Sequence, residues 1–537
     1  MASFDYIIIG AGSAGCVLAD RLSSSGKFRV LLVEAGPSDD RFWVRTPIGY
    51  GMLFNDSRVN WRYRTNAETG LDNRQLYWPR GKVLGGSSSI NALVYHHGQP
   101  ADYDDWAAAG NPGWDYHSIK PIYNSFEDII RNDDQRPMIG KLTVSDVADE
   151  YHPLKSHFFS MANEMGLHND AACRLDGEGL YPYFITTRHG VRCSSSKAFL
   201  HPAASRPNLT VMTDCMATRI EVRDGRAIAV HLMQQGAPVR LAADGEIIIS
   251  AGAVNSPQLL QLSGIGPGAI SQRNGIDVML DQPNVGLHLS DHLGVNYYQR
   301  ASCATLNSVF GSWPRIGLAG LQYLFTKKGP LSLGVNQLGG LLRARADAPR
   351  PDTQIYINPI TYRPPPPGGR RPFLPDREPG FIFSFNSCRP FSTGRIEINT
   401  PDWRQPPLIF GNYLSDPRDL DDVIHMARLV GRMQDSAAVG QILAAPPETP
   451  LSRLSDDAII DDFRARSGTV YHPCGTCRMG PDAAHAVVDP ALRVHGIDRL
   501  RIADASVFPN ITSANLNAPT IMLAHKAAQL VLQDRQG

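Results

Sequence analysis

Three glycines near the start of the chain have the spacing that cradles the pyrophosphate of a dinucleotide. Gly10, Gly12 and Gly15 follow the pattern G-x-G-x-x-G. Gly10 is expected to permit a tight turn, Gly12 to let the backbone approach the phosphates, and Gly15 to allow a helix to pack closely on a strand. The helix that follows would then direct the positive end of its dipole at the phosphates.

An acidic residue, Glu34, stands where the next predicted strand ends. Its carboxylate can accept hydrogen bonds from ribose hydroxyls and would repel a 2′-phosphate, so NADP is disfavoured. The motif itself does not distinguish FAD from NAD. Another glycine-rich stretch, residues 263–267, follows a helical pattern rather than a strand, and we interpret it as structural. A single dinucleotide site is therefore predicted.

Two cysteines, Cys474 and Cys477, have the C-x-x-C spacing of redox and zinc sites. No second pair completes a four-ligand set, so the motif alone is weak support for either site. The eight cysteines are scattered and too sparse for a disulfide framework, which indicates a reducing compartment. No signal peptide precedes the first predicted strand, and no apolar run reaches about 18 residues. We therefore expect a cytoplasmic protein without a transmembrane segment.

The composition is that of a large globular protein. Of 537 residues, 42% are hydrophobic, which is enough for a large core and for two or more domains. Lysine plus arginine (52) equals aspartate plus glutamate (52), so the basic excess of a nucleic-acid-binding protein is missing. The longest basic cluster, Arg370–Arg371, follows Pro364–Pro367 in what is expected to be an exposed loop, and we interpret it as a solvated edge.

The glycine motif lies within a strand–turn–helix–strand pattern. Residues 4–9 and 28–33 are apolar and β-branched, and residues 17–22 between them have a helical pattern. Two apolar strands joined by a helix are typical of a parallel sheet. Further buried strands are predicted at residues 246–250 and 500–503. These elements predict an α/β, Rossmann-like dinucleotide-binding domain.

A second region has a different character. Between residues 297 and 467, short strand patterns such as 381–385 and 394–398 alternate with helical ones, which predicts an antiparallel sheet that carries helices. The chain would then be α+β overall. We assign a discontinuous dinucleotide-binding domain to residues 1–148, 190–296 and 468–537, and a discontinuous substrate-binding domain to residues 149–189 and 297–467.

Four further segments lie at residues 81–98, 251–266, 471–480 and 515–520. They read GKVLGGSSSINALVYHHG, AGAVNSPQLLQLSGIG, YHPCGTCRMG and NLNAPT. Together they resemble the glucose–methanol–choline (GMC) oxidoreductase family, in its choline-dehydrogenase-like and bacterial alcohol-oxidase-like members. The segments follow the family's motif order and span nearly the whole chain. The resemblance implies an FAD cofactor and the oxidation of an alcohol to a carbonyl compound.

The resemblance also implies where FAD would be held. Asn91 to Val94 would lie against the isoalloxazine, Asp504 near the ribityl chain and pyrophosphate, and the backbone of Ala217 against the adenine. The glycine–serine turn at residues 85–89 offers backbone N–H groups to a phosphate or to the flavin edge. The expected FAD contacts are Gly10, Gly12, Ser13, Ala14, Gly15, Glu34, Ala35, Val83, Gly86, Ser87, Asn91, Ala92, Leu93, Val94, Ala217, Tyr471, Asp504, Ala505, Asn517, Pro519 and Thr520.

One position departs from part of the family. Some relatives bind FAD covalently through a histidine immediately before the asparagine of the first signature, and here that position is Ile90. Isoleucine cannot form this bond. We therefore expect FAD to be held without a covalent link, with lower retention and a less oxidising flavin.

Alcohol oxidation by a flavin requires the hydroxyl proton to be removed, and histidine has a suitable pKa for this task. By resemblance, His472 in the His-Pro-x-Gly-Thr pattern is the catalytic base. The second catalytic position is histidine in some relatives and asparagine in others, and we assign it to Asn517, which would donate to the substrate oxygen. Asn515 is two residues away, but the spacing to Pro519-Thr520 and to the helix predicted at 519–532 favours Asn517. The N-terminus of that helix would be aimed at N1 and O2 of the flavin.

No motif specifies the substrate. Tyr471, Trp313 and Phe385 are candidate wall residues, although the sequence is equally consistent with a place for each in the core. Aromatic and small residues in the pocket lining favour an uncharged primary alcohol, aromatic or heteroaromatic. The electron acceptor would be oxygen or a quinone or dye. The same resemblance interprets Cys477 as a packing residue and Cys474 as a small side chain beside the site.

Three other functions compete with alcohol oxidation. A hydroxynitrile lyase would keep the flavin and a histidine base but cleave cyanohydrins without net redox. A flavin-binding protein without catalysis would leave His472 and Asn517 without a role, and a nicotinamide dehydrogenase would leave residues 471–520 without one.

Overall fold

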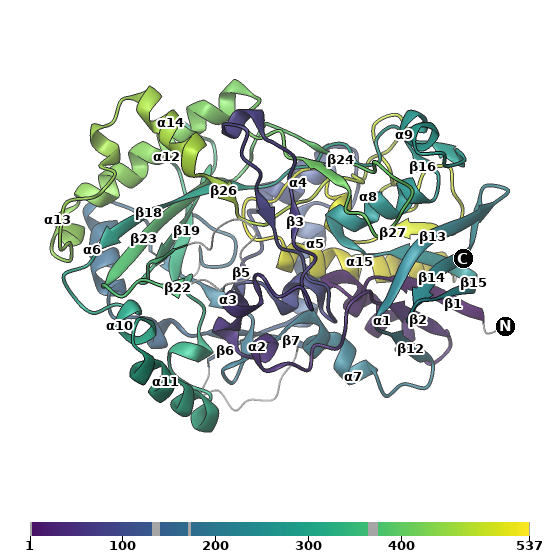
Figure 1. Cartoon of the computed structure of the whole chain (residues 1–537), viewed down its shortest axis with the longest axis horizontal. Coiled ribbons are helices and arrows are strands. Elements are labelled where there is room, and N and C mark those ends of the chain that lie inside the picture. Colours follow the sequence, from purple (N-terminus) through teal and green to yellow (C-terminus); the bar gives the residue numbers. More distant parts are fainter. Residues whose placement is uncertain (1–2, 132–139, 170–172, 364–373, 536–537) are drawn as a thin grey trace.

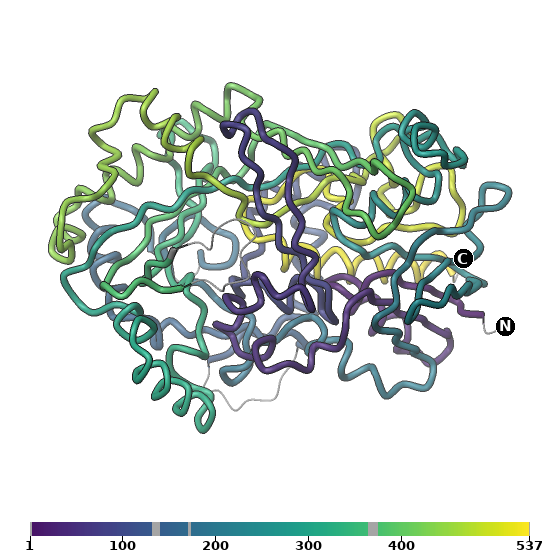
Figure 2. The backbone as a smooth tube through the Cα atoms, viewed as in Figure 1, coloured from purple at the N-terminus to yellow at the C-terminus, as the bar shows by residue number. Residues whose placement is uncertain are grey.

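The computed structural model of the chain describes residues 3–131, 140–169, 173–363 and 374–535. Pro364–Pro367 and Arg370–Arg371 lie outside the described residues. Two main sheets occupy opposite ends of the molecule, and both chain termini lie at the end that holds the first of them (Figures 1 and 2). Among the described helices, none has the length and hydropathy needed to cross a membrane.

The first sheet contains the predicted βαβ unit. Its strands follow the order β12-β2-β1-β15-β14-β13, and β27 also pairs with β15. The bounds are β1 (Ser3–Ile9), β2 (Val30–Val33), β12 (Leu209–Met212), β13 (Cys215–Arg223), β14 (Arg226–Gln234), β15 (Ala237–Ile249) and β27 (Leu500–Ile502). The pairs of β1 with β2 and of β15 with β1 and β27 are parallel, whereas β14 runs antiparallel to both its neighbours.

The parallel strands are buried on both faces, as their sequences predict. Tyr6–Ile9, Val30–Val33 and Ile247–Ile249 are at most a few per cent exposed. Runs of β-branched residues suit such strands because helices and loops cover both sides of a parallel sheet. Helix α1 (Ser13–Ser23) follows β1 directly and packs beside α15 (Asn517–Asp534), the helix predicted after the last strand (Figure 1). The predicted Rossmann-like domain is confirmed.

The second sheet is antiparallel and carries helices, also as predicted. Its order is β19-β20-β23-β18-β26, with β18 (Leu293–Arg300), β19 (Leu338–Leu342), β20 (Thr353–Asn358), β23 (Gly380–Ser387) and β26 (Gly468–Thr469). Helices α12 (Pro417–Asp435) and α14 (Asp456–Arg466) pack against β23 and β18. Strand β18 crosses the proposed boundary at 296/297, and β26 pairs with it from beyond 467. The division into two domains stays a prediction.

Smaller elements complete the described chain. The other helices are α2 (Phe42–Arg45), α3 (Tyr50–Leu53), α4 (Pro100–Ala108), α5 (Tyr116–Phe126), α6 (Lys155–Glu164), α7 (His201–Ala203), α8 (Gly252–Leu262), α9 (Gly268–Arg273), α10 (Asn307–Phe310), α11 (Trp313–Thr326) and α13 (Ala437–Gly440). Short strands include β5 (Val94–Tyr95), β9 (Phe184–Ile185), β16 (Ile265–Gly266), β17 (Leu280–Asp281), β24 (Arg395–Glu397) and β25 (Leu408–Phe410). The predicted strand at 394–398 is β24, which pairs with β25 outside the main sheet.

Candidate active site

A cavity of about 1460 Å³ is lined by residues of both sheets. Gly10, Glu34 and Asp504, which follow β1, β2 and β27, form part of its wall. The carboxyl ends of parallel strands are where α/β folds bind ligands. His472 and Asn515 line the same cavity. One continuous space therefore joins the glycine motif to the candidate base.

The glycine motif forms a tight backbone cradle. Gly10 has φ +99°, and a Cβ there would lie 2.5 Å from the carbonyl oxygen of Ser250. A Cβ on Gly15 would lie 1.9 Å from the carbonyl oxygen of Gly10, so the helix can approach the strand only with glycine at this position. A Cβ on Gly86 would lie 2.7 Å from Cα of Gly12, so two glycine loops meet at the cavity wall. Glycine is required at these positions because of close backbone contacts.

Two carboxylates organise the ends of the strands around this cradle. Glu34 accepts hydrogen bonds from the backbone N–H groups of Ala11 (2.9 Å) and Gly36 (2.8 Å), and burial raises its pKa to about 7. Asp504 accepts from the N–H of Gly252 at 2.9 Å and thereby caps the start of α8. Each carboxylate oxygen has two lone pairs, so Glu34 retains acceptor capacity toward a ligand.

Most of the expected FAD contacts line the cavity. These are Gly10, Gly12, Ser13, Ala14, Glu34, Ala35, Gly86, Ser87, Asn91, Ala92, Leu93, Val94, Ala217, Tyr471, Asp504, Ala505, Asn517 and Thr520. Gly15, Val83 and Pro519 are not part of the wall. Val83 is fully buried in a cluster with Val44. These three residues therefore support the site by packing.

His472 is held by a strained and hydrogen-bonded loop that follows β26. Tyr471 has φ +72°, a left-handed conformation that costs energy in a residue with a Cβ. The Arg80 guanidinium donates to the carbonyl of Tyr471 at 2.8 Å, and Asp291 accepts from the backbone N–H of His472 at 2.7 Å. Asp291 also accepts from the hydroxyl of Thr469 at 2.5 Å. The surrounding contacts thus fix the position of the histidine.

The hydrogen bonds of His472 define its tautomer. Nε2 of His292 lies 3.0 Å from the carbonyl oxygen of Cys388, and because a carbonyl only accepts, this nitrogen carries the proton. Nδ1 of His292 is then an acceptor, and it receives a hydrogen bond from Nδ1–H of His472 at 3.0 Å. Nε2 of His472 is left with its lone pair. The amide of Asn515 donates to that nitrogen at 3.1 Å, which requires the same tautomer.

Both imidazoles are neutral near pH 7. Burial, followed by the nearby His292 and Arg80, lowers the pKa of His472 well below its usual value. Burial also lowers the pKa of His292 to about 4. A neutral imidazole with an unprotonated Nε2 can accept a proton from a hydroxyl that takes the place of the Asn515 amide, which is what a general base must do.

The expected spatial pairing of Asn517 with His472 is wrong. The amide beside the histidine is that of Asn515, which lies in the loop that precedes α15. Asn517 is the first residue of the helix, and its amide oxygen accepts a hydrogen bond from the hydroxyl of Ser13 at 2.8 Å. Its side chain is therefore directed toward the N-terminus of α1. Asn515 lies in the loop before α15 and Asn517 in its first turn, so the two side chains are directed to different parts of the cavity.

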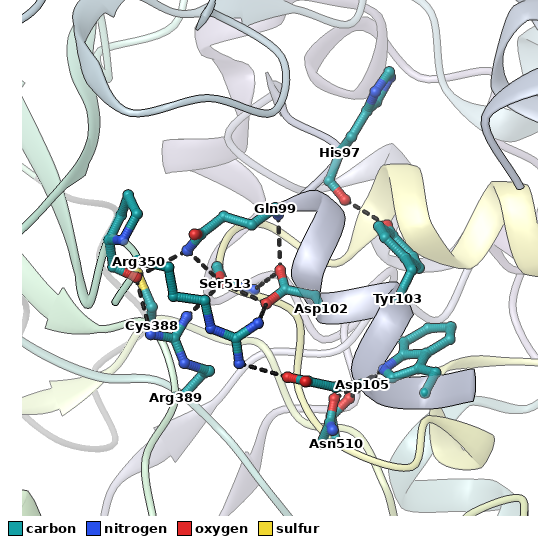
Figure 3. Close-up of polar contacts among 12 residues, drawn as sticks. His97, Gln99, Asp102, Tyr103, Asp105, Arg350, Cys388, Arg389, Asn510 and Ser513 are labelled. Atoms are coloured by element: carbon teal, nitrogen blue, oxygen red, sulfur yellow. Dashed lines mark hydrogen bonds and ion pairs between the residues drawn. The ribbon is translucent and has the colours of Figure 1, made fainter. Parts of the chain in front are cut away.

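The segment that carries Asn515 is anchored by a buried polar network (Figure 3). Asp102, in the first turn of α4, accepts from the backbone N–H of Ser513 at 2.8 Å and from its hydroxyl at 2.7 Å. Gln99 and Arg389 also donate to this hydroxyl, at 2.9 and 3.1 Å. Arg389 follows Cys388, whose carbonyl orients His292. The end of β23 thus supports both residues that contact His472.

Two of the three expected wall residues line the cavity. Tyr471 and Trp313 are part of its wall, whereas Phe385 is fully buried in the core of the second sheet. Of the two alternatives for Phe385, the core position is the one observed, because its side chain points to the helix-covered face. Cys474 and Cys477 are fully buried, and burial raises both thiol pKa values well above the usual range.

Comparisons with known proteins agree with this arrangement. Two family models, both described as GMC oxidoreductase, match residues 4–294 and 390–524. The chain belongs to the GMC oxidoreductase family. It is therefore an FAD-dependent oxidoreductase that acts on CH–OH donors. Two features fit this cofactor. A Cβ on the glycines of the cradle would meet backbone atoms, and the cavity is large.

Individual GMC relatives match over their full length. The chain is 39% identical to an alcohol dehydrogenase [acceptor] of Pseudomonas putida, over 99% of this chain and 96% of that protein. It is 38% identical to an oxygen-dependent choline dehydrogenase of Photobacterium profundum, over 99% and 93% of the two chains. The crystal structure of pyridoxine 4-oxidase from Mesorbium loti superposes with a TM-score of 0.87 at 27% identity, over 99% of both chains.

Proposed function

We propose that this GMC oxidoreductase oxidises an uncharged primary alcohol, with a preference for aromatic or heteroaromatic alcohols, to the aldehyde. His472 removes the hydroxyl proton through Nε2, and Asn515 donates a hydrogen bond to the substrate oxygen as negative charge develops there. FAD, held without a covalent bond because Ile90 replaces the linking histidine, supplies the acceptor for the hydride at its N5 atom. The observation that carries the proposal is the unprotonated Nε2 of a neutral His472 in the cavity, which accepts a hydrogen bond from Asn515.

The proton follows a defined route. Nε2 of His472 accepts it and becomes imidazolium, and the new charge is shared with His292, whose Nδ1 already accepts from Nδ1–H. His292 has no further nitrogen that could accept the substrate proton. Its Nδ1 already accepts from His472, and its Nε2–H donates to the carbonyl of Cys388. His472 is therefore the sole base, and it releases the proton when product leaves.

The described wall of the cavity argues against a cationic substrate. Its only carboxylates are Glu34 and Asp504, which follow strands of the parallel sheet. Tyr298, Tyr356 and Tyr362 belong to the same wall. A quaternary ammonium group would be attracted to aromatic faces but would find no carboxylate in the described cavity wall near His472, because Asp291, which accepts from the backbone N–H of His472, is not part of that wall. An uncharged alcohol with an aromatic ring suits this lining better.

A panel of alcohols tests the proposal. The purified holoenzyme is mixed anaerobically with benzylic, heteroaromatic and aliphatic primary alcohols and with choline, and flavin bleaching is followed. Bleaching by the aromatic alcohols, faster than by choline, is expected. Parallel turnover with oxygen and with an artificial dye identifies the acceptor class. A flavin that stays oxidised with every alcohol while a cyanohydrin is cleaved would favour the lyase instead.

A further inference from the structure

Helix α11 exposes an apolar surface of unusual extent. Its only buried side chains are Ala319 and Tyr323, which cluster with Leu331 and with the partly buried Ile48. Its large apolar side chains have exposed fractions of 84% for Trp313, 69% for Leu318, 54% for Leu321, 52% for Leu324 and 86% for Phe325. A helix that is apolar on all sides is normally covered on all sides.

The exposed side chains form one continuous arc of the helix. At about 100° per residue, Trp313, Leu321 and Leu318 fall on the side opposite Ala319 and Tyr323. A Cβ added at Gly317 or Gly320 would meet no atom within 4 Å, so no other described segment covers this helix there. In Figures 1 and 2, α11 lies at the periphery of the molecule. A surface of this kind marks an interaction site.

The charged residues next to α11 in the sequence are all positive. Arg315 lies in its first turn, and Lys327 and Lys328 follow its C-terminus. Between residues 292 and 346 the sequence contains no aspartate or glutamate, although the chain as a whole has equal numbers of both signs. An apolar face of Trp, Leu and Phe flanked by cations is typical of helices that lie in the interface of an anionic membrane.

A second copy of the chain fits this surface less well. In a two-fold dimer the same patch meets itself, so the cations of both copies would enter one interface. The helix offers no carboxylate to pair with them. Anionic phospholipid headgroups supply the missing charge, and their acyl chains cover the apolar arc.

The apolar surface is continuous with an exposed part of the cavity wall. Trp313 and Ile316 of α11 are part of the cavity wall, as are Trp43 and Met52, which are 37% and 42% exposed. A membrane that covered α11 would therefore lie beside these exposed residues of the cavity wall.

We propose that α11 docks the protein onto the surface of a membrane that contains anionic phospholipids. The helix lies in the plane of the interface, with Leu321 and Phe325 among the acyl chains and Arg315 and Lys328 at the headgroups. This docking does not depend on the identity of the alcohol, and it places the part of the cavity wall formed by Trp313 and Ile316 beside the bilayer.

Vesicle co-sedimentation of the holoenzyme tests the docking. The probes are vesicles of phosphatidylcholine mixed with phosphatidylglycerol, and vesicles of phosphatidylcholine alone. The wild-type protein is expected to sediment with the mixed vesicles. The double substitution Leu321→Glu and Phe325→Glu should lower the partition coefficient by more than about tenfold, because two charges would enter the apolar layer. Val278→Glu, at an exposed apolar residue remote from α11, is the matched control and should sediment like wild type.

A charge variant tests the choice of lipid. Arg315→Gln with Lys328→Gln should weaken binding to the mixed vesicles about fivefold for each cation removed, and added salt should weaken wild-type binding. Thermal melting and flavin absorbance are expected to match wild type in every variant, since these side chains are exposed.

Three results would overturn the proposal. Wild-type protein that stays in the supernatant with both vesicle types would exclude docking. Equal sedimentation with both types would exclude the anionic preference. A dimer in analytical ultracentrifugation without lipid, which becomes monomeric in the Leu321→Glu, Phe325→Glu protein, would assign the surface to a second copy of the chain.

Discussion

Nδ1 of His472 donates a hydrogen bond to Nδ1 of His292 over 3.0 Å, and this contact fixes which nitrogen of the candidate base is free. The carbonyl of Cys388 determines the tautomer of His292, and His292 in turn determines that of His472. An imidazole in the other tautomer would present N–H to the cavity and could not accept a proton there. His292 is thus a positioning residue for the proposed base.

Replacement of His292 should slow flavin reduction while FAD stays bound. His292→Leu leaves the buried Nδ1–H of His472 without an acceptor, at a cost of about 1–3 kcal/mol, or roughly 5- to 150-fold in rate. His292→Gln keeps an acceptor oxygen and should recover part of the rate. Anaerobic stopped-flow measures both variants. If His292→Leu matched wild type, or if the glutamine gave no recovery, the positioning role would be refuted.

Alanine substitutions of the two asparagines should have different effects. Asn515→Ala is expected to slow flavin reduction by about 10²-fold, the size of one lost donor to a developing oxyanion, with full FAD content. Asn517→Ala should act chiefly on FAD retention, because its amide oxygen contacts Ser13 rather than His472. Reduction rates and flavin occupancy after dialysis are measured on both proteins. The reverse pattern would restore Asn517 as the catalytic partner.

FAD should be released by acid. Ile90 lines the cavity beside Asn91 and has no nucleophilic atom, so no covalent link can form there. Precipitation with trichloroacetic acid is expected to leave the yellow colour in the supernatant. Flavin fluorescence that remains on the protein band after denaturing electrophoresis would contradict this prediction.

Glu34 should contribute to FAD retention. Glu34→Ala removes one or two charge-assisted hydrogen bonds to the ribose, about 1.5–3 kcal/mol each, and should increase FAD loss during dialysis. Glu34→Gln keeps the size and an acceptor oxygen and is the matched control, with an intermediate loss. Because burial raises the pKa of Glu34 to about 7, the carboxylate and its stronger hydrogen bonds are favoured above this pH, so retention in wild type should improve as pH rises. Full occupancy of the alanine variant after dialysis would exclude the contact.

The architecture was largely predictable from local sequence patterns. The buried β-branched runs form β1, β2, β15 and β27, as their local sequence predicts. The glycine spacing likewise predicts the turn between β1 and α1. The cavity wall at Gly10 and Glu34 follows from the same rule, since both residues stand at the carboxyl ends of parallel strands.

The contacts of His472 were not predictable in this way. His292 reaches it only because β18 pairs with β26, in a register that sets Leu293 opposite Thr469. Asn515 and Asn517 are two residues apart, and only the start of α15 at Asn517 decides which one faces His472. A helix boundary is the least certain feature of a sequence pattern, and here it changed the assignment of a site residue.

The central claim, that His472 is the base, is tested most directly by the rate of anaerobic flavin reduction in His472→Ala. This variant should retain FAD and its fold and reduce its flavin about 10²–10⁴-fold more slowly than wild type. In wild type the rate should fall at low pH as the imidazole is protonated. The midpoint should lie below about 6.5, the ordinary histidine value, because burial lowers the pKa of His472. This acid limb should be lost in the variant. Reduction of His472→Ala at near wild-type speed, or an unchanged acid limb, would contradict the account.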